Sequence, residues 1–191
     1  MLNITDFENE RFTDITSFEG DCSDKVFTSC FFQRCNFTGV DCGSAVFEEC
    51  IFEDCNLSMT DLGNAQMHNV EFRSCKIMGV DFTRCSMFAF DIHFKKCEIS
   101  SSNFSGLKLK KTLFLECAIR ESDFLNADCS EADFSDTSFY RAEFNHTNLF
   151  KADFSRATGY VINPLNNNVK KAVFTLPDAI SLVEELGVLI R

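Results

Sequence analysis

Eleven cysteines and three histidines are the side chains of this 191-residue sequence that could most readily bind a metal ion or act as nucleophiles. Metal-binding and redox cysteines usually occur in pairs spaced C-x-x-C, and the sequence contains no such pair. The cysteines instead follow a five-residue spacing, as in Cys50 and Cys55. A helical period of about 3.6 or a strand period of about 2 residues does not explain that spacing. The element that positions the thiols must therefore be identified before any chemistry is assigned to them.

The three histidines give no sign of an active site. His68, His93 and His146 are isolated in the sequence, and we expect them to be solvated surface residues. The glycine-rich phosphate-binding motifs, H-E-x-x-H and G-x-S-x-G do not occur. Because catalysis needs converging groups in a cleft, we predict no catalytic, cofactor or metal site and a protein that is not an enzyme.

Charge and hydropathy restrict the possible partners. The formal net charge of −11 disfavours a general nucleic-acid binder and an anionic lipid surface, whereas it permits a basic protein partner. No apolar run reaches the length of a membrane span, and the first ten residues do not resemble a signal peptide. Together with the odd number of cysteines, these features predict a cytoplasmic protein with reduced thiols, no membrane contact and no direct nucleic-acid contact.

A repeat explains the spacing of the cysteines. A large apolar residue, here called the centre, recurs at nearly every fifth position from Phe7 to Phe154, and a small residue stands two positions before it. The stretch ADCSEADFSDTSFYRAEFNHTNLFKADFS at 127–155 shows the pattern most clearly. All eleven cysteines fall at a centre or at the small position. Because a buried thiol behaves as a small, inert hydrophobe, we interpret them as core residues.

This tandem pattern resembles the pentapeptide-repeat proteins over about residues 5–158. The resemblance implies an all-β solenoid, a right-handed quadrilateral β-helix in which each pentapeptide forms one side of a square coil. The sequence supports coils of four pentapeptides, because every fourth centre falls in a column of phenylalanines once two extra residues are placed between Met87 and Phe94. That column is Phe12, Phe32, Phe52, Phe72, Phe94, Phe114, Phe134 and Phe154.

The two extra residues predict a small bulge at a corner of one coil. The residues of this possible loop are Phe88, Ala89, Phe90, Asp91, Ile92 and His93. We expect the bulge to leave the stack of coils undisturbed.

The position just before each centre is expected to point outward, and in one column it is almost always acidic. The acids of this column, here called the acidic edge, are Asp21, Asp41, Asp61, Asp81, Asp123 and Glu143, with Asn103 between Asp81 and Asp123. Asp or Asn at this position can simply support the turn. The alternative is a partner-binding edge with about 4.8 Å between charges, loosely comparable with roughly 3.4 Å per phosphate on one DNA strand.

The pattern changes after Phe154, and residues 159–191 are expected to form a cap and dimerisation segment next to a repeat domain of residues 1–158. Thr175 and Asp178 resemble a capping pair, and the following apolar residues predict a short amphipathic helix. The end of a solenoid must be covered, so a monomeric cap is one interpretation. A cap that also forms a twofold dimer is the other, because its apolar content exceeds the need of one narrow end.

The C-terminal stretch GYVINPLNNNVKKAVFTLPDAISLVEELGVLI at 159–190 resembles the ending of pentapeptide-repeat proteins of the Qnr, MfpA and McbG type. The resemblance implies a homodimeric DNA mimic that binds DNA gyrase or topoisomerase IV and protects it from quinolones or toxins. It also implies dimer contacts through the C-terminal segment, at Val173, Phe174, Ile180, Val183, Leu186 and Leu189. Long projecting loops, which Qnr proteins use for protection, are absent from the sequence. The alternative is a non-catalytic pentapeptide-repeat scaffold that binds another protein.

Overall fold

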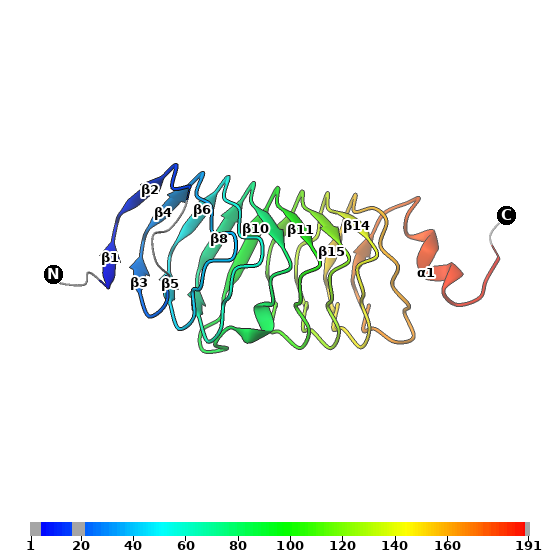
Figure 1. Cartoon of the computed structure of the whole chain (residues 1–191). Coiled ribbons are helices and arrows are strands. Elements are labelled where there is room, and N and C mark those ends of the chain that lie inside the picture. Colours follow the sequence, from blue (N-terminus) through cyan, green and yellow to red (C-terminus); the bar gives the residue numbers. More distant parts are fainter. Residues whose placement is uncertain (1–4, 17–21, 190–191) are drawn as a thin grey trace.

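The computed structural model describes residues 5–16 and 22–189. The chain winds into a rod of stacked parallel coils, with one short helix at its C-terminal end (Figure 1). This architecture confirms the predicted right-handed quadrilateral β-helix with a short helical cap. The strands are short because each side of a coil is only one pentapeptide long.

Parallel pairing between coils defines the faces of the rod, which are numbered 1 to 4 in the order in which the chain visits them. Face 1 contains β1 (Asp6–Glu8), β3 (Val26–Thr28), β5 (Val46–Glu48) and β7 (Gln66–His68). Face 2 contains β2 (Arg11–Thr13), β4 (Phe31–Gln33), β6 (Ile51–Glu53), β8 (Val70–Arg73), β10 (Ile92–Lys95), β12 (Phe114–Leu115), β15 (Asp153–Phe154) and β16 (Val173–Phe174). Face 3 contains β9 (Lys76–Met78), β11 (Glu98–Ser100), β13 (Ala118–Arg120) and β14 (Ser138–Tyr140). Face 4 contains the 3-10 helix η1 (Phe82–Arg84) and isolated bridges.

The corners between faces require left-handed backbone. The second residue after a centre has a positive φ on every face, as at Asn9 (55°), Arg34 (51°), Met59 (58°) and Asn64 (58°). Such backbone is uncommon for residues other than glycine, so the corners depend on the ladders that hold them.

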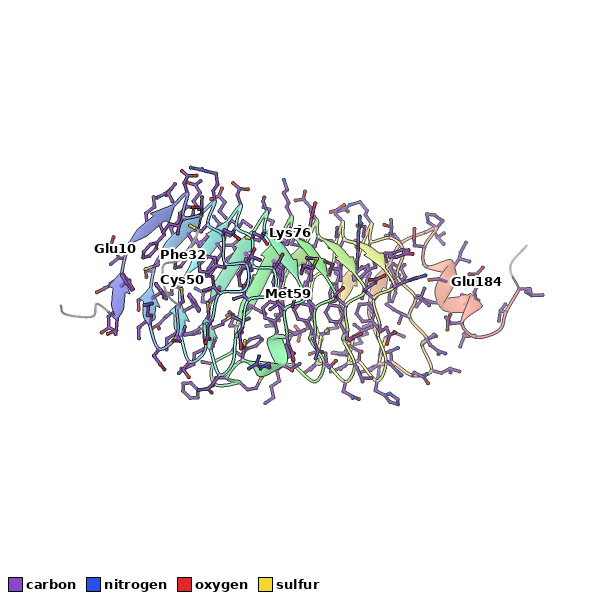
Figure 2. The ribbon with its side chains drawn as sticks, in the orientation of Figure 1. Glu10, Phe32, Cys50, Met59, Lys76 and Glu184 are labelled. Atoms are coloured by element: carbon purple, nitrogen blue, oxygen red, sulfur yellow. The ribbon has the colours of Figure 1, made fainter. Side chains whose placement is uncertain are left out.

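The phenylalanine column of face 2 forms the centre of the rod. Its rings stack on one another with centroids 4.6 to 5.2 Å apart, and rings of neighbouring faces meet them edge-on. Phe32 is one of these buried rings (Figure 2). Fully burying one such side chain contributes about 1.5–3 kcal/mol, and aromatic contact adds to this. The column is therefore the main source of cohesion between coils.

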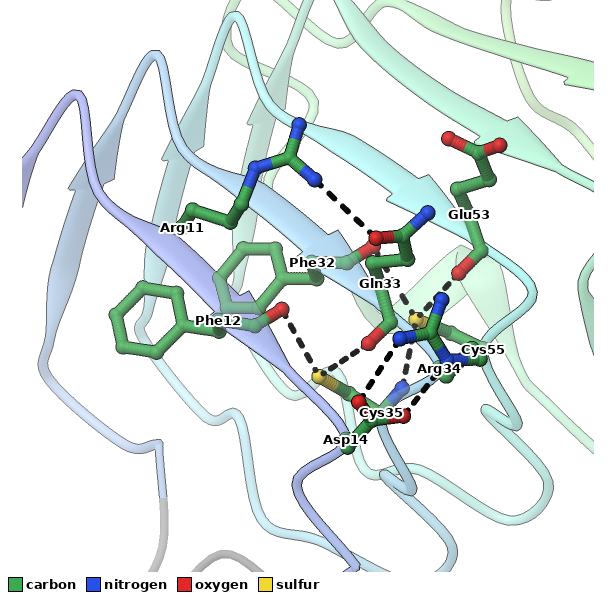
Figure 3. A network of polar contacts seen from close by, with 9 residues as sticks. All are labelled: Arg11, Phe12, Asp14, Phe32, Gln33, Arg34, Cys35, Glu53 and Cys55. Atoms are coloured by element: carbon green, nitrogen blue, oxygen red, sulfur yellow. Dashed lines mark hydrogen bonds and ion pairs between the residues drawn. The ribbon is translucent and has the colours of Figure 1, made fainter.

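The side chain at the small position, two residues before each centre, fits the narrow interior and, where it is polar, can also donate a hydrogen bond. Its thiol, hydroxyl or amide donates to the backbone carbonyl of a centre on the preceding coil, as Cys50 Sγ does to Phe27 O (3.3 Å) and Thr60 Oγ1 to Phe37 O (2.9 Å). Figure 3 shows Cys35 Sγ in the same arrangement, donating to Phe12 O (3.4 Å). Cysteine therefore fits this position because it is small and a weak donor.

All eleven cysteines are buried, and none of them forms a disulfide. Burial raises the pKa of the Cys50 thiol and that of the Cys85 thiol to about 12 in each case. These two thiols are therefore protonated at neutral pH, as expected for core residues rather than nucleophiles.

The two extra residues are located as predicted, but the bulge is shorter than the predicted loop. Phe72 pairs with Phe94, two positions further along the chain than the regular pairing of Phe52 with Phe72 would give. Ile92 and His93 belong to β10, where Ile92 is fully buried at the small position, so they are not part of a loop. Met87, expected as a centre, is exposed, whereas Phe90 packs against the core. The extra residues let Phe90 turn inward in place of Met87.

The parallel ladder continues beyond residue 158. β16 pairs with β15, and the Phe174 ring stacks on that of Phe154 at 5.0 Å, which adds a ninth ring to the column. The expected change of pattern after Phe154 therefore does not end the solenoid. A helix follows, α1 (Ile180–Glu184).

The prediction that Thr175 and Asp178 cap the start of the helix is wrong. The N-cap residue of α1 is Ala179, which makes no side-chain capping bond. Thr175 Oγ1 accepts a hydrogen bond from Arg156 N (2.9 Å), and Asp178 Oδ1 accepts one from Gly159 N (2.9 Å). Both side chains thus tie the C-terminal segment to the preceding coil instead of starting the helix.

Candidate functional site

The acidic edge is a continuous column on face 4. Bridges join Asp41 to Asp61, and others run from Asp81 through Asn103 and Asp123 to Glu143. Asp21 lies outside the described residues. Each coil adds about 4.8 Å, so the described edge extends over roughly 25 Å of the rod. The structure thus brings five acids into one line on the surface.

Three aspartates of the edge, Asp41, Asp61 and Asp81, also support their own turns. Asp41 Oδ1 accepts from Gly43 N (2.8 Å), Asp61 Oδ1 from Gly63 N (2.9 Å) and Asp81 Oδ1 from Thr83 N (3.1 Å). One carboxylate oxygen is enough for this bond, and asparagine can make it equally well. The turn therefore explains an Asp or Asn at these positions, but it does not explain a preference for the charged residue.

The same turns on other faces show how local this role is. Asp128, Asp133 and Asp153 accept hydrogen bonds from the backbone N–H two residues later, at 3.1, 2.9 and 2.7 Å. Asn56 does the same for Ser58 N (3.1 Å). Only face 4 keeps an acid at this position in nearly every described coil. The repetition of charge is a property of the edge rather than of the turn.

One residue of the edge has a basic partner that sequence reasoning missed. Arg84 Nη1 lies 2.7 Å from Asp61 Oδ1, and both side chains are about half exposed. A Cβ on Gly63 would lie only 3.0 Å from Arg84 Nη2, so the glycine leaves room for the guanidinium. A surface pair contributes only about 0.2–1 kcal/mol. Its main consequence is to neutralise the middle of the edge, and the one-coil spacing does not reveal it, because one coil back from Arg84 is Asn64 rather than Asp61.

The bulge occupies face 1 of its coil, between η1 on face 4 and β10 on face 2, and presents an apolar tip. Phe88 is 79% exposed and Met87 is also exposed. By contrast, His93 is fixed by the ladder, since its Nδ1 accepts from Leu113 N (3.2 Å) and its Nε2 lies 3.3 Å from Asp91 Oδ1. Among the described residues of the predicted loop, only those of the tip could contact a partner without disturbing a strand.

The C-terminal end has the largest gathering of exposed apolar residues. Of the six predicted dimer contacts, Val173, Val183, Leu186 and Leu189 are exposed, the last at 86%. Ile180 is half-buried, and Phe174 is occupied by its stack on Phe154. Leu182 covers the end of the core. The cap therefore closes its own coil and still leaves apolar surface uncovered.

The described part of the chain holds neither a metal-binding cluster nor a membrane-spanning helix. Residues 5–16 and 22–189 contain no group of three or more His, Cys, Asp or Glu side chains arranged for a metal ion. In the same ranges no helix has the length and apolarity to cross a membrane.

Comparison with known families agrees with this geometry. The model of a pentapeptide repeat region matches residues 25–91, and that of pentapeptide repeats, in eight copies, matches residues 117–156. The two matches together cover more than half of the chain. The chain therefore belongs to the pentapeptide-repeat family.

Solved structures with the same fold include several of QnrB1, described as a plasmid-mediated fluoroquinolone resistance protein. A trypsin-treated QnrB1 variant is 22% identical with a TM-score of 0.72, over 99% of this chain and 93% of its own. A second trypsin-treated variant is 20% identical with a TM-score of 0.64, over 97% of this chain and 100% of its own. Full-length QnrB1 is 19% identical with a TM-score of 0.57, over 96% and 100%. A search of curated proteins finds no match.

Proposed function

We propose that the protein is a non-catalytic DNA mimic that binds a bacterial type II topoisomerase, DNA gyrase or topoisomerase IV. The acidic edge is the observation that carries this proposal, because it presents a line of carboxylates on a narrow rod of net charge −11. A basic DNA-binding saddle would attract such a line and be occupied by it. The likeness of the fold to QnrB1 supports the choice of partner. A partner that acts on the chromosome implies a cytoplasmic protein.

The proposed complex is a homodimer joined through the C-terminal segment. Dimerisation would cover Val183, Leu186 and Leu189, and it would join two acidic edges into one longer rod. Leu186→Glu with Leu189→Glu should give a monomer by light scattering. Leu113→Glu, an exposed leucine on face 2, is the control and should leave the dimer intact. A monomeric unmodified protein would overturn this part of the proposal.

Protection from quinolones is the narrower part of the proposal. The bulge is short, and only Phe88 and Met87 project from it. We therefore expect binding to inhibit or modulate the topoisomerase more readily than to displace a drug.

A pulldown and a supercoiling assay with purified gyrase and topoisomerase IV, at low salt and with or without a quinolone, test the function. We expect retention on the enzyme and a change in supercoiling, both weakened by salt. No retention by either enzyme at low salt would contradict the proposal. Retention of a different basic protein in its place would favour the scaffold alternative.

A further inference from the structure

The sign of the surface charge reverses along face 1. Its first coils carry acids, among them Glu8, Glu48 and Glu49. Beyond the bulge the same face carries six exposed lysines, a third of the eighteen basic residues in a chain of charge −11. This lysine face consists of Lys108, Lys110, Lys111, Lys151, Lys170 and Lys171.

Pairing between coils brings these lysines together. Bridges link Lys108 to Asp128, Asp128 to Asn148 and Asn148 to Asn168, which fixes the register of the whole face. In that register Lys151 lies against Lys171 on the next coil, and Lys151 N donates to Lys170 O (3.1 Å). Like charges placed opposite each other in a ladder are destabilising. The cluster therefore carries a small cost that the fold itself does not require.

The described residues neutralise little of this charge. Lys110 Nζ lies 3.5 Å from Glu131 Oε1, which is the only ion pair of the lysine face within residues 5–16 and 22–189. Asp128 Oδ1 accepts hydrogen bonds from two neutral donors, Asn148 Nδ2 (2.7 Å) and Ser130 N (3.1 Å). Most of the lysines thus offer free ammonium groups to an external anion.

We propose that the lysine face binds a short acidic segment of a partner protein, at a surface separate from the acidic edge. The face extends over four coils, roughly 15 Å, which suits a short run of carboxylates. A DNA duplex carries a charge about every 1.7 Å and would extend past this length toward the acidic first coils of the same face. That mismatch favours a protein segment over nucleic acid. The inference does not depend on the identity of the partner of the acidic edge.

Titration of a fluorescent deca-glutamate peptide with the full chain at low salt tests this inference. The triple variant Lys108→Glu, Lys151→Glu and Lys171→Glu should weaken binding at least about tenfold. A matched triple makes the same charge change on faces 2 and 3, at exposed residues Lys76, Lys95 and Arg120. Lys76 is labelled in Figure 2. The affinity of this control for the peptide should stay within about twofold of that of the unmodified chain. Both triples change the net charge by the same amount, so the control also measures the effect of net charge alone.

Three outcomes would overturn the inference. The first is equal weakening in both triples, which would show a response to net charge alone. The second is that a DNA duplex of the same charge as the peptide binds more tightly than the peptide, and that the first triple loses this binding. That result would assign the face to nucleic acid. The third is a self-association of the unmodified chain that only the first triple abolishes, which would assign the face to a second copy. Thermal unfolding of all three proteins checks that the fold is retained.

Discussion

Phe88 and Phe94 lie close together in the sequence and have opposite surroundings. Phe94 is fully buried, with the Phe72 ring 5.2 Å on one side and the Phe114 ring 5.0 Å on the other. Phe88 is 79% exposed at the tip of the bulge. The residue type is the same, so position in the five-residue register decides which side chain joins the core and which is left for a partner.

Truncating the two phenylalanines gives the largest expected difference. Phe94→Ala should lower the free energy of unfolding by about 3–5 kcal/mol, because it removes a ring from the middle of the column and leaves a cavity. Phe88→Ala should change it by less than about 0.5 kcal/mol. Denaturant unfolding of the two variants measures both. Similar losses would show that the bulge contributes to the core and would remove the distinction.

Two glycines extend the comparison to the backbone. Gly106 and Gly159 both have left-handed φ, 70° and 71°. A Cβ at Gly106 would meet nothing within 4 Å, whereas one at Gly159 would lie 2.3 Å from Phe139 O. Gly106→Ala should therefore cost roughly 1–2 kcal/mol and Gly159→Ala roughly 2–5 kcal/mol, the additional loss being steric. Equal melting temperatures would mean that the last coil yields to the extra methyl group.

Thiol titration probes the interior with a smaller effect. Burial holds the pKa of Cys50 at about 12, compared with 9.0 for a free thiol. The folded chain therefore keeps the Cys50 proton, which the unfolded chain loses, so the contribution of Cys50 to the free energy of unfolding should fall as pH rises from about 9 toward about 12. In the same way, a thiol reagent at pH 8 should label the native chain slowly and all eleven cysteines after unfolding. Rapid labelling of the native chain would contradict burial of the thiols.

Much of the fold could be predicted because inward positions repeat at a fixed spacing. The phenylalanine column, the burial of the cysteines and the number of inserted residues follow from that spacing. The choice between Met87 and Phe90 could not be predicted, since two extra residues allow either to turn inward. The last coil could not be predicted because its register shifts. Phe144 pairs with Ile162, two positions short of the regular spacing between coils, whereas Asn148 pairs with Asn168 at that regular spacing.

The candidate site was less predictable than the fold. Stepping along the sequence by one coil aligned the acids of the edge, but it could not show that Arg84 neutralises Asp61 or that Asp41 supports a turn. Those contacts depend on side-chain direction at a corner. The function of the edge depends on its charge, and its turn role depends only on an acceptor oxygen, so a substitution can separate the two.

Replacing Asp41, Asp61 and Asp81 together by asparagine removes charge from the acidic edge and keeps the turn bonds. The matched control replaces Asp128, Asp133 and Asp153, which make the same bonds on faces 1 and 2. Binding of each triple variant to purified gyrase is then compared with that of the unmodified chain. We predict at least about tenfold weaker binding for the edge variant and a change within about twofold for the control. Equal affinities of the two variants would contradict the acidic edge as the gyrase-binding surface.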